Sequence, residues 1–305
     1  MNTILVVTNS RDLTVDYMIN KYGSSVGFFR LNVDLLHSYN ITFSNRGHFF
    51  EISGEYGTLS SHQVSAVYYR KPILPNLDDY EQRFRNLMHR DIMTLIEGIT
   101  ETVGVRCLSR PSILRRADNK IVQLQLAQEI GFHLPASLVT NSARAAKEIC
   151  KEEKSIVKPL SLGRIIHENT VGIIQTNLVD SKKDFLGLEL SPAYFQHYMK
   201  KDTEVRATIV GREVFAVSID STDPIDWRKP EARHKYDLIE LPEKVTKQCF
   251  AMMDTLGLSF GAFDFIIREG QYVFLEVNAN GQWLWLEEAL SLNISNAIIN
   301  YLTGK

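Results

Sequence analysis

The chain has little net charge, few cysteines and no long apolar run, and each shortage excludes a class of protein. Its net charge is −2 with 23% charged residues, so it lacks the cationic surface that a general nucleic-acid binder needs. The three cysteines, Cys107, Cys150 and Cys249, are far apart and form no CxxC pair, so neither a disulfide framework nor a zinc knuckle is indicated. The first apolar run ends before Asn9 and is too short for a signal peptide, and no later run reaches membrane-spanning length. We therefore expect a cytoplasmic protein that binds neither nucleic acid nor membrane.

Two common nucleotide-binding motifs are also missing. The 305 residues contain no GxxxxGK[ST] loop, and no GxGxxG follows a predicted strand, so neither a P-loop nor a dinucleotide fold is supported. If the chain binds ATP, it must hold the nucleotide in another way.

The elements that the sequence predicts divide the chain into three regions. Predicted strands alternate with predicted helices over residues 1–110, which indicates an α/β domain. In its last segment, Leu77 to Val103, apolar residues recur at helical spacing. Pro111 opens a second region, 111–190, and a hairpin-rich unit, 191–305, follows and ends in a predicted helix, Leu286–Leu302. The other expected elements are strands at Thr3–Thr8, Gly27–Leu31, Ala66–Tyr69 and Ser155–Pro159, and helices up to Tyr22 and over Asp118–Ile130.

Two lysines are candidates for binding a nucleotide phosphate. Lys158 lies in the apolar strand Ser-Ile-Val-Lys-Pro-Leu, where an ammonium beside a core needs an anionic partner. Lys120 follows Ala-Asp-Asn at the start of a predicted helix, where backbone N–H groups already favour anions. The alternative for each is a surface lysine whose stem covers apolar neighbours.

Glu204 and Arg206 lie two residues apart on a predicted strand that turns at Gly211-Arg212, so their side chains point to the same face. One side chain can accept from ribose hydroxyls while the other neutralises a phosphoryl oxygen. The alternative is an ordinary ion pair between the two.

The strongest local pattern is a β-hairpin near the C-terminus, with strands around Asp264 and Glu276 and a turn at Arg268–Gln271. A loop of three or five residues places Asp264 opposite Glu276, with Asn278 further along the same face; a loop of even length would put the two acids on opposite faces. The remaining occupants of that face are predicted to be apolar: Ala262, Ile266 and Phe274. Carboxylates among apolar side chains need a cation beside them, and three groups that each offer an oxygen ligand suit Mg²⁺. A solvated sheet edge is the alternative.

Taken in order, these elements resemble the ATP-grasp superfamily, and more closely its peptide-modifying branch, the microviridin-type ligases or graspetide synthetases. The resemblance spans most of the chain, and Leu275-Glu276-Val277-Asn278-Ala279-Asn280-Gly281-Gln282-Trp283 is its most specific segment. The other matching segments are Tyr69–Pro72, Ala117–Leu124, Gly131–Pro135, Thr140-Asn141, Ile156–Pro159, Phe195-Gln196, Glu204–Arg206, Val214–Ala216 and Ile225–Arg228. The family implies an ATP-grasp fold with an N-terminal α/β domain, a central lysine-bearing domain and a C-terminal metal-binding domain.

The resemblance also implies a role for each matching residue. The expected nucleotide ligands are Lys120 and Lys158 for the phosphates, Gln196, His197 and Tyr198 at a hinge for adenine, Glu204 for ribose, and Asn278. The expected Mg²⁺ ligands are Asp264, Glu276 and Asn278, while Arg206 with Arg228 stabilises the transferred phosphoryl group. Two positions depart from the common pattern: Ala262 replaces an arginine, and His197 replaces an acidic residue.

In this branch, ATP phosphorylates a Glu or Asp side chain of a ribosomal precursor peptide, and a Thr or Ser hydroxyl, or a Lys amine, closes a macrocycle. Two alternatives are an ATP-grasp amino-acid ligase and a silent peptide-binding protein. Three further roles have candidates only. The base could be Asp226, Glu231 or His234, and the loop Leu160–Asn169 is a candidate lid or a plain surface loop. The segments Leu77–Val103 and Arg106–Arg116 are candidates for docking the peptide, or they only pack the N-terminal domain. We also expect a homodimer or higher homo-oligomer.

Overall fold

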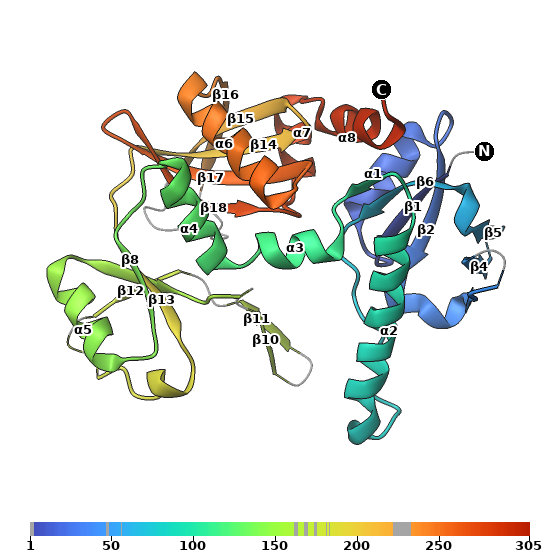
Figure 1. Cartoon of the computed structure of the whole chain (residues 1–305). Coiled ribbons are helices and arrows are strands. Elements are labelled where there is room, and N and C mark those ends of the chain that lie inside the picture. Colours follow the sequence, from blue (N-terminus) through green and yellow to red (C-terminus); the bar gives the residue numbers. More distant parts are fainter. Residues whose placement is uncertain are drawn as a thin grey trace.

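The structure is a computed structural model, and it describes residues 3–46, 49–55, 57–161, 164–167, 170–173, 176–180, 182, 184–221 and 233–305. It contains parallel and antiparallel sheets with helices packed on them, arranged as three units (Figure 1). No helix in these ranges is both long and apolar enough to cross a membrane.

The N-terminal unit is a parallel sheet with the strand order β2-β1-β6-β7. Its strands run over Thr3–Thr8 (β1), Gly27–Asn32 (β2), Val64–Tyr69 (β6) and Arg106–Leu108 (β7), and its helices over Leu13–Tyr22 (α1) and Gln82–Thr102 (α2). A smaller antiparallel sheet lies beside it, formed by Asn40–Phe43 (β3), Phe50–Gly54 (β4) and Gly57–Ser60 (β5). The predicted strands of this region are confirmed.

Helix α2 begins at Gln82, so the prediction of helical spacing from Leu77 was wrong for its first turn. The Asn76 side chain accepts from the backbone N–H of Asp78 at 2.7 Å, which forms a turn ahead of the helix. At the other end, the Arg110 guanidinium donates to the carbonyls of Thr100, at 2.5 Å, and Gly104, at 2.8 Å. Arg110 therefore satisfies carbonyls at the end of α2 that have no partner within the helix.

The central unit begins with helices α3 (Pro111–Ala117) and α4 (Lys120–Ile130). Helix α4 starts two residues later than predicted, because the Asn119 side chain caps it by accepting from Ile121 N and Val122 N. The sheet that follows has the order β12-β9-β13-β8. Its elements are Ser137–Thr140 (β8), Ser155–Lys158 (β9), Asn177–Val179 (β12), Ala193–His197 (β13) and the covering helix Ala143–Glu152 (α5), with a hairpin of Arg164–His167 (β10) and Thr170–Ile173 (β11).

The C-terminal unit is a five-stranded antiparallel sheet with the order β16-β15-β14-β17-β18. Its strands are Thr203–Val210 (β14), Glu213–Ser221 (β15), His234–Ile239 (β16), Phe260–Arg268 (β17) and Gln271–Asn278 (β18), and helix α6 spans Glu243–Leu256. The single helix predicted over Leu286–Leu302 is wrong, since α7 (Leu284–Leu290) and α8 (Ile294–Thr303) are separated at Ser291, whose φ is +53°. This break lets α7 contact β16 while α8 contacts β6 and β7.

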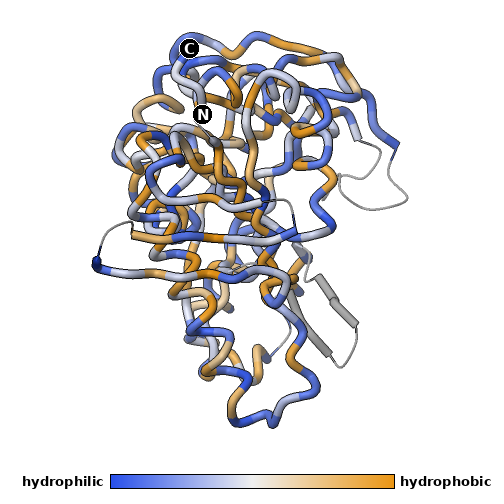
Figure 2. The backbone as a smooth tube through the Cα atoms, turned by 90° about the vertical axis from the view of Figure 1, so that its right-hand side faces the viewer, coloured by the Kyte–Doolittle hydropathy of each residue, from blue (hydrophilic) through white to orange (hydrophobic). Residues whose placement is uncertain are grey.

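One buried cluster joins the N-terminal sheet to the C-terminal unit. It contains Ile4 and Tyr68 from the sheet, and Trp283, Leu286 and Ile298 from the chain after β18. Figure 2 shows short hydrophobic and hydrophilic stretches alternating along the coloured part of the backbone, as expected for many elements that each bury one face. The shared core brings the end of β6 beside the segment that follows β18, and the candidate site lies at this junction.

Candidate active site

The hairpin of β17 and β18 places the two candidate metal carboxylates opposite each other, although its loop has an even number of residues. The loop contains Glu269 and Gly270, both with positive φ, and in a regular ladder a loop of this length would put the two acids on opposite faces. The ladder shifts between Asp264 and Phe265, which indicates a β-bulge, and beyond this point Asp264 pairs with Glu276. The bulge supplies the extra residue that a longer loop would have supplied.

The same bulge changes the apolar residues of that face. Phe274 pairs with Phe265 and stacks on Phe132 with a 4.8 Å centroid separation, so it lies in the core on the opposite face. Its predicted place beside the carboxylates was wrong, and Val273, the partner of Ile266, occupies it. The prediction did not allow for the register shift.

Asp264, Glu276 and Asn278 converge as expected. The Asn278 amide nitrogen donates to Asp264 Oδ2 at 2.9 Å and to Glu276 Oε1 at 3.3 Å. Arg206 Nη1 donates to both oxygens of Asp264, at 2.5 and 2.7 Å. Lys120 Nζ forms an ion pair with Glu276. Two carboxylates and two cations thus balance one another around a shared amide.

Lys120 reaches Glu276 because α4 is fixed against β18 by a buried glutamine. Gln123 donates to the Val277 carbonyl at 2.9 Å and accepts from the Val277 N–H at 3.1 Å, across 154 residues of sequence. Lys120 lies three residues before Gln123 and therefore on the same side of the helix. Gln123 lies in a segment on which the resemblance was based, but no pattern in the sequence indicated this contact.

The strand that carries Arg206 and a close contact with the backbone at Gly281 determine the position of its side chain. It lies opposite Asp264 in the pairing of β14 with β17, and its side chain is 10% exposed. A Cβ atom on Gly281 would lie 3.2 Å from its Nη2 and 2.7 Å from the Ala262 Cβ, so only glycine fits there. Glu204 forms its ion pair with Lys201. The alternative of an ion pair between Glu204 and Arg206 is therefore wrong.

Lys158 and the predicted hinge lie on the sheet of the central unit. Lys158 Nζ is 5.0 Å from the centroid of the Tyr194 ring. Gln196 is buried and donates to the Tyr194 hydroxyl at 2.9 Å, so its side chain supports the sheet. His197 Nε2 lies 3.6 Å from Glu152, and the backbone N–H of Tyr198 donates to the carbonyl of Lys154 at 2.7 Å. A contact of this hinge with adenine remains a prediction.

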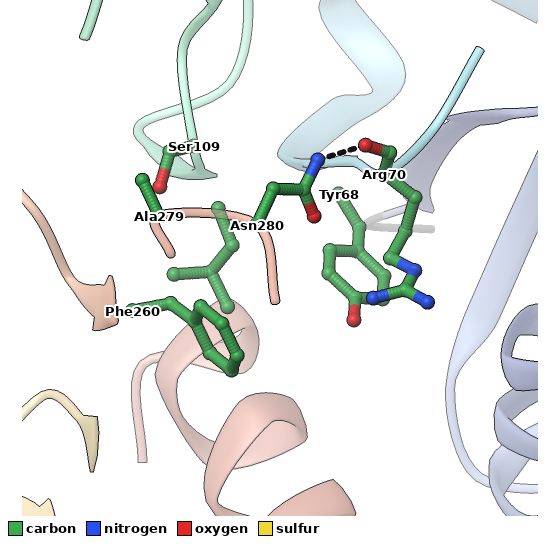
Figure 3. Close-up of a pocket in the computed structure, with 7 residues that line it drawn as sticks. Tyr68, Arg70, Ser109, Phe260, Ala279 and Asn280 are labelled. Carbon is green, nitrogen blue, oxygen red and sulfur yellow. Dashed lines mark hydrogen bonds between the residues drawn. The ribbon is translucent and has the colours of Figure 1, made fainter. Parts of the chain in front are cut away.

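The segment after β6 meets the segment after β18 through Arg70, a residue to which the sequence assigned no role. Arg70 is 1% exposed; its guanidinium contacts Asp12 at 3.3 Å and donates to Gln282 Oε1 at 2.6 Å. Asn280 donates to the Arg70 carbonyl (Figure 3). Burial opposes ionisation of Asp12, but Arg70 and a hydrogen bond from Thr8 outweigh it, so the pKa of Asp12 lies below its usual value.

A small void lies behind this junction, between Tyr68, Ser109, Phe260 and Asn280 (Figure 3). Its volume of about 10 Å³ accommodates no more than one water molecule. The hydroxyl of Ser109 has no hydrogen-bond partner among the described residues. The void is thus too small for a nucleotide, which must bind elsewhere.

Several predicted residues fall outside the described ranges. Arg228, with the candidate bases Asp226 and Glu231, lies in residues 222–232, and part of the predicted lid over 160–169 is likewise outside. His234 is described, and its ring stacks at 5.9 Å from Tyr236. The described residues contain no group of three or more His, Cys, Asp or Glu side chains suited to a metal.

Two carboxylates and one amide still fit Mg²⁺, since this ion takes few protein ligands and completes its shell with water and nucleotide phosphates. Asp264 and Glu276 pair across the hairpin and both accept from the Asn278 amide, so the three side chains already converge.

Comparison with known proteins shows which proteins the whole chain resembles. No family profile matches the chain. It is 28% identical to a RiPP-associated ATP-grasp ligase from Chryseobacterium gregarium, solved with ADP and a leader and core peptide; the TM-score is 0.88, covering 100% of this chain and 97% of that one. The macrocyclase MdnC of Microcystis aeruginosa, bound with precursor peptide MdnA, is 27% identical with a TM-score of 0.88, covering 99% and 100%. The alpha-aminoadipate–LysW ligase LysX of Sulfurisphaera tokodaii is 24% identical over 228 residues, 70% of this chain and 77% of that protein. The predicted ATP-grasp fold is confirmed.

Proposed function

As an ATP-grasp carboxylate ligase, this chain uses ATP to activate a carboxylate, and we propose that the carboxylate belongs to a Glu or Asp side chain of a ribosomal precursor peptide. The convergence of Asp264, Glu276 and Asn278 with Lys120 and Arg206 carries this proposal. Its peptide part is supported by two similar ligases whose structures contain precursor, leader or core peptides.

The chemistry follows from the weakness of a carboxylate as an electrophile. One carboxylate oxygen attacks the γ-phosphorus of ATP, the bond to the β–γ bridging oxygen breaks, and ADP leaves with the electron pair. A Thr or Ser hydroxyl then attacks the acyl phosphate, loses its proton to a base, and expels phosphate as the ester forms. Both steps depend mostly on positioning and on neutralising charge.

Each residue of the site has a part in that scheme. Mg²⁺ held by Asp264, Glu276 and Asn278 would neutralise charge on the nucleotide phosphates. Lys120 and Lys158 bind the phosphates, and Arg206 stabilises the phosphoryl group as it moves. Arg206 is suited to this because a guanidinium in a largely water-excluded position interacts strongly with developing charge. Gln196, His197 and Tyr198 hold adenine, Glu204 binds ribose, and Arg228 adds a second guanidinium.

Two other products remain candidates. An amide-forming macrocyclase needs only a Lys amine in place of the hydroxyl, since both attack the same acyl phosphate. An amino-acid ligase is the second candidate, and the similarity to LysX favours it. Docking of a leader peptide on α2 and on residues 106–116 remains a proposal, from which Arg110 is excluded by its contacts with the end of α2.

A peptide assay separates these products. Candidate precursor peptides that contain acidic and Thr residues are incubated with the full-length protein, ATP and Mg²⁺, and followed by mass spectrometry. Each ring should lower the peptide mass by one water, and mild alkali should restore the mass if the link is an ester but not if it is an amide. A gain in mass equal to an added amino acid would move the protein to the amino-acid ligases.

A further inference from the structure

Arg70, at the end of β6, forms two hydrogen bonds with the turn that follows β18. Its Nη2 donates to Gln282 Oε1 at 2.6 Å, and its backbone carbonyl accepts from the side chain of Asn280 (Figure 3). The two bonded residues are the neighbours of Gly281 on either side. A residue of the N-terminal unit therefore fixes the position of Gly281 in the C-terminal unit.

Gly281 in turn packs on the guanidinium of Arg206. A Cβ atom on Gly281 would lie 3.2 Å from Arg206 Nη2 and 3.4 Å from the Cβ of Asn278. The hydrogen bonds of Arg206 to Asp264 both come from Nη1, and among the described residues Arg206 Nε has no hydrogen-bond partner. A guanidinium held through one nitrogen can pivot about it, whereas two donating nitrogens would fix its plane. The orientation of Arg206 therefore depends on the packing of Gly281.

Arg70 is itself held firmly inside the N-terminal unit. Its side chain is 1% exposed, and its Nε donates to Asp12 Oδ2 at 3.3 Å. Asp12 caps α1 by accepting from the backbone N–H of Thr14 at 3.1 Å. The Arg70 Cζ lies 5.9 Å from the centroid of the Tyr68 ring. The planar guanidinium thus presents its Nη2 to the turn from a fixed position.

A simpler role for Arg70 would be to join the two units. The units already share a buried apolar cluster that includes Trp283, and Tyr17 donates to Glu287 at 2.7 Å across the same junction. A buried ion pair such as that of Arg70 also contributes little net stability, because desolvation offsets the attraction. The distinct contribution of Arg70 is the position of the turn.

We propose that Arg70 is a positioning residue of the ligase. By holding Asn280 and Gln282, it keeps Gly281 against Arg206 and so orients the guanidinium for phosphoryl transfer. This role requires no contact of Arg70 with ATP or with the peptide. It affects the rate of the phosphoryl step and not the affinity for the nucleotide. The inference rests on the proposed role of Arg206.

The first test is Gln282→Met in the full-length protein, which removes the acceptor at an exposed position and leaves Arg70 paired with Asp12. With a candidate precursor peptide as the substrate, kcat should fall about 10-fold, the scale of a misplaced catalytic group. The ATP KM and the affinity for a fluorescent ADP analogue should not change. Tyr17→Phe is the matched control, because it removes another hydrogen bond between the same units. Both variants should lower the Tm by about 2–4 °C, but the control should keep the wild-type kcat.

A double-substitution cycle shows whether the effect passes through Arg206. In Arg206→Ala there is no guanidinium to orient, so adding Gln282→Met should change the rate of ADP release by less than about threefold. Residues that act as a unit are not additive in this way. A further tenfold loss in the double variant would mean that Gln282 acts independently of Arg206, and the inference would be overturned.

Crystal structures test the positioning without any substrate. In Gln282→Met the Arg206 guanidinium should turn away from Asp264, while β14 superposes on the wild type. Arg70→Lys should give the same result if Gln282→Met does not fold, because an ammonium lacks the fork that reaches both partners of Arg70. An unchanged Arg206 in these structures overturns the inference, as does an effect confined to the peptide KM.

The proposed function fails in a different way. A wild-type protein that releases no ADP with any candidate peptide, or an Arg206→Ala variant with the wild-type rate, refutes the proposed function or the role of Arg206. Because the crystal structures report only where the guanidinium lies, they distinguish that failure from a failure of Arg70 to position it.

Discussion

Asp264→Asn removes one negative charge from the centre of the site and keeps the shape of the side chain. In the wild type this carboxylate accepts from Arg206 through both oxygens and from Asn278 through one. The substitution thus leaves the Arg206 guanidinium without its counter-charge and takes one anionic oxygen from the proposed Mg²⁺ site. We expect a modest loss of stability and a large loss of ATP turnover.

The exposure of the pair fixes the size of the first effect. Arg206 is 10% and Asp264 is 20% exposed, so the pair lies between a fully buried and a surface ion pair. Breaking the former costs about 3–5 kcal/mol and the latter contributes about 0–1 kcal/mol, so we expect a loss of about 2 kcal/mol. Domains are typically stable by about 5–15 kcal/mol, so the variant should remain folded, with a Tm lower by about 4–8 °C.

The loss of turnover should be far larger than any unfolded fraction explains. Removing one group that stabilises developing charge typically costs about 100-fold or more in rate. The measurements are thermal melting and ADP release at saturating ATP, with Mg²⁺ titrated. Asp254→Asn is a matched control, because Asp254 also pairs with an arginine, Arg212, but both side chains are more than half exposed at 62% and 58%.

The control should melt within about 2–4 °C of the wild type, the shift that corresponds to about 1 kcal/mol, and release ADP at the wild-type rate. If Asp264→Asn releases ADP within about threefold of the wild type at saturating Mg²⁺, the carboxylate does not serve the metal and the assignment is wrong.

Three further predictions concern two other residues of the site and Glu287, a buried residue of α7. Arg206→Ala should bind ATP within about tenfold of the wild type but react about 100-fold more slowly, and a pure affinity loss in a nucleotide titration would reassign it. Gln123→Leu leaves both backbone groups of Val277 without a partner, so thermal melting should show a loss of about 2 kcal/mol and the ATP KM should rise. Burial raises the pKa of Glu287, but hydrogen bonds from Ser295 and Lys21 lower it by more, so the net shift is downward. The ionised Glu287 therefore stabilises the folded protein, and this stabilisation is lost as the pH falls through the pKa of the folded state. Glu287→Gln should therefore lower the Tm at pH 7, and this difference should shrink below about pH 4; an equal difference at both pH values would contradict it.

Local pattern predicted the elements well where one periodicity dominates. The hairpin of β14 and β15 was predicted because Gly211-Arg212 interrupts two apolar runs, and the structure has this turn. The helix break at Ser291 was missed because apolar residues continue through it at helical spacing. The residue adopts a left-handed conformation so that α8 can pack on the N-terminal sheet, and only tertiary packing makes this favourable.

The candidate site was predictable as a set of residues but not as a set of contacts. Asp264, Glu276 and Asn278 share a hairpin, so local alternation placed them close together. The contacts of Lys120 with Glu276 and of Gln123 with Val277 span more than 150 residues, and nothing in either segment alone encodes its partner. The contact of Arg70 with Asn280 likewise depends on the shared core, which brings the end of β6 beside the segment after β18.

Because of the bulge between β17 and β18, the length of the hairpin loop does not by itself determine whether the two carboxylates face each other. A chain with a regular ladder and a loop longer by one residue would present the same pair of acids, because the extra residue can reside in the turn or in the strand. Relatives whose turns differ in length by one residue can therefore share one site, with the same number of residues between the two acids. When such chains are superposed, the acids should serve as the fixed points, because an alignment anchored at the turn would assign the second carboxylate to its neighbour.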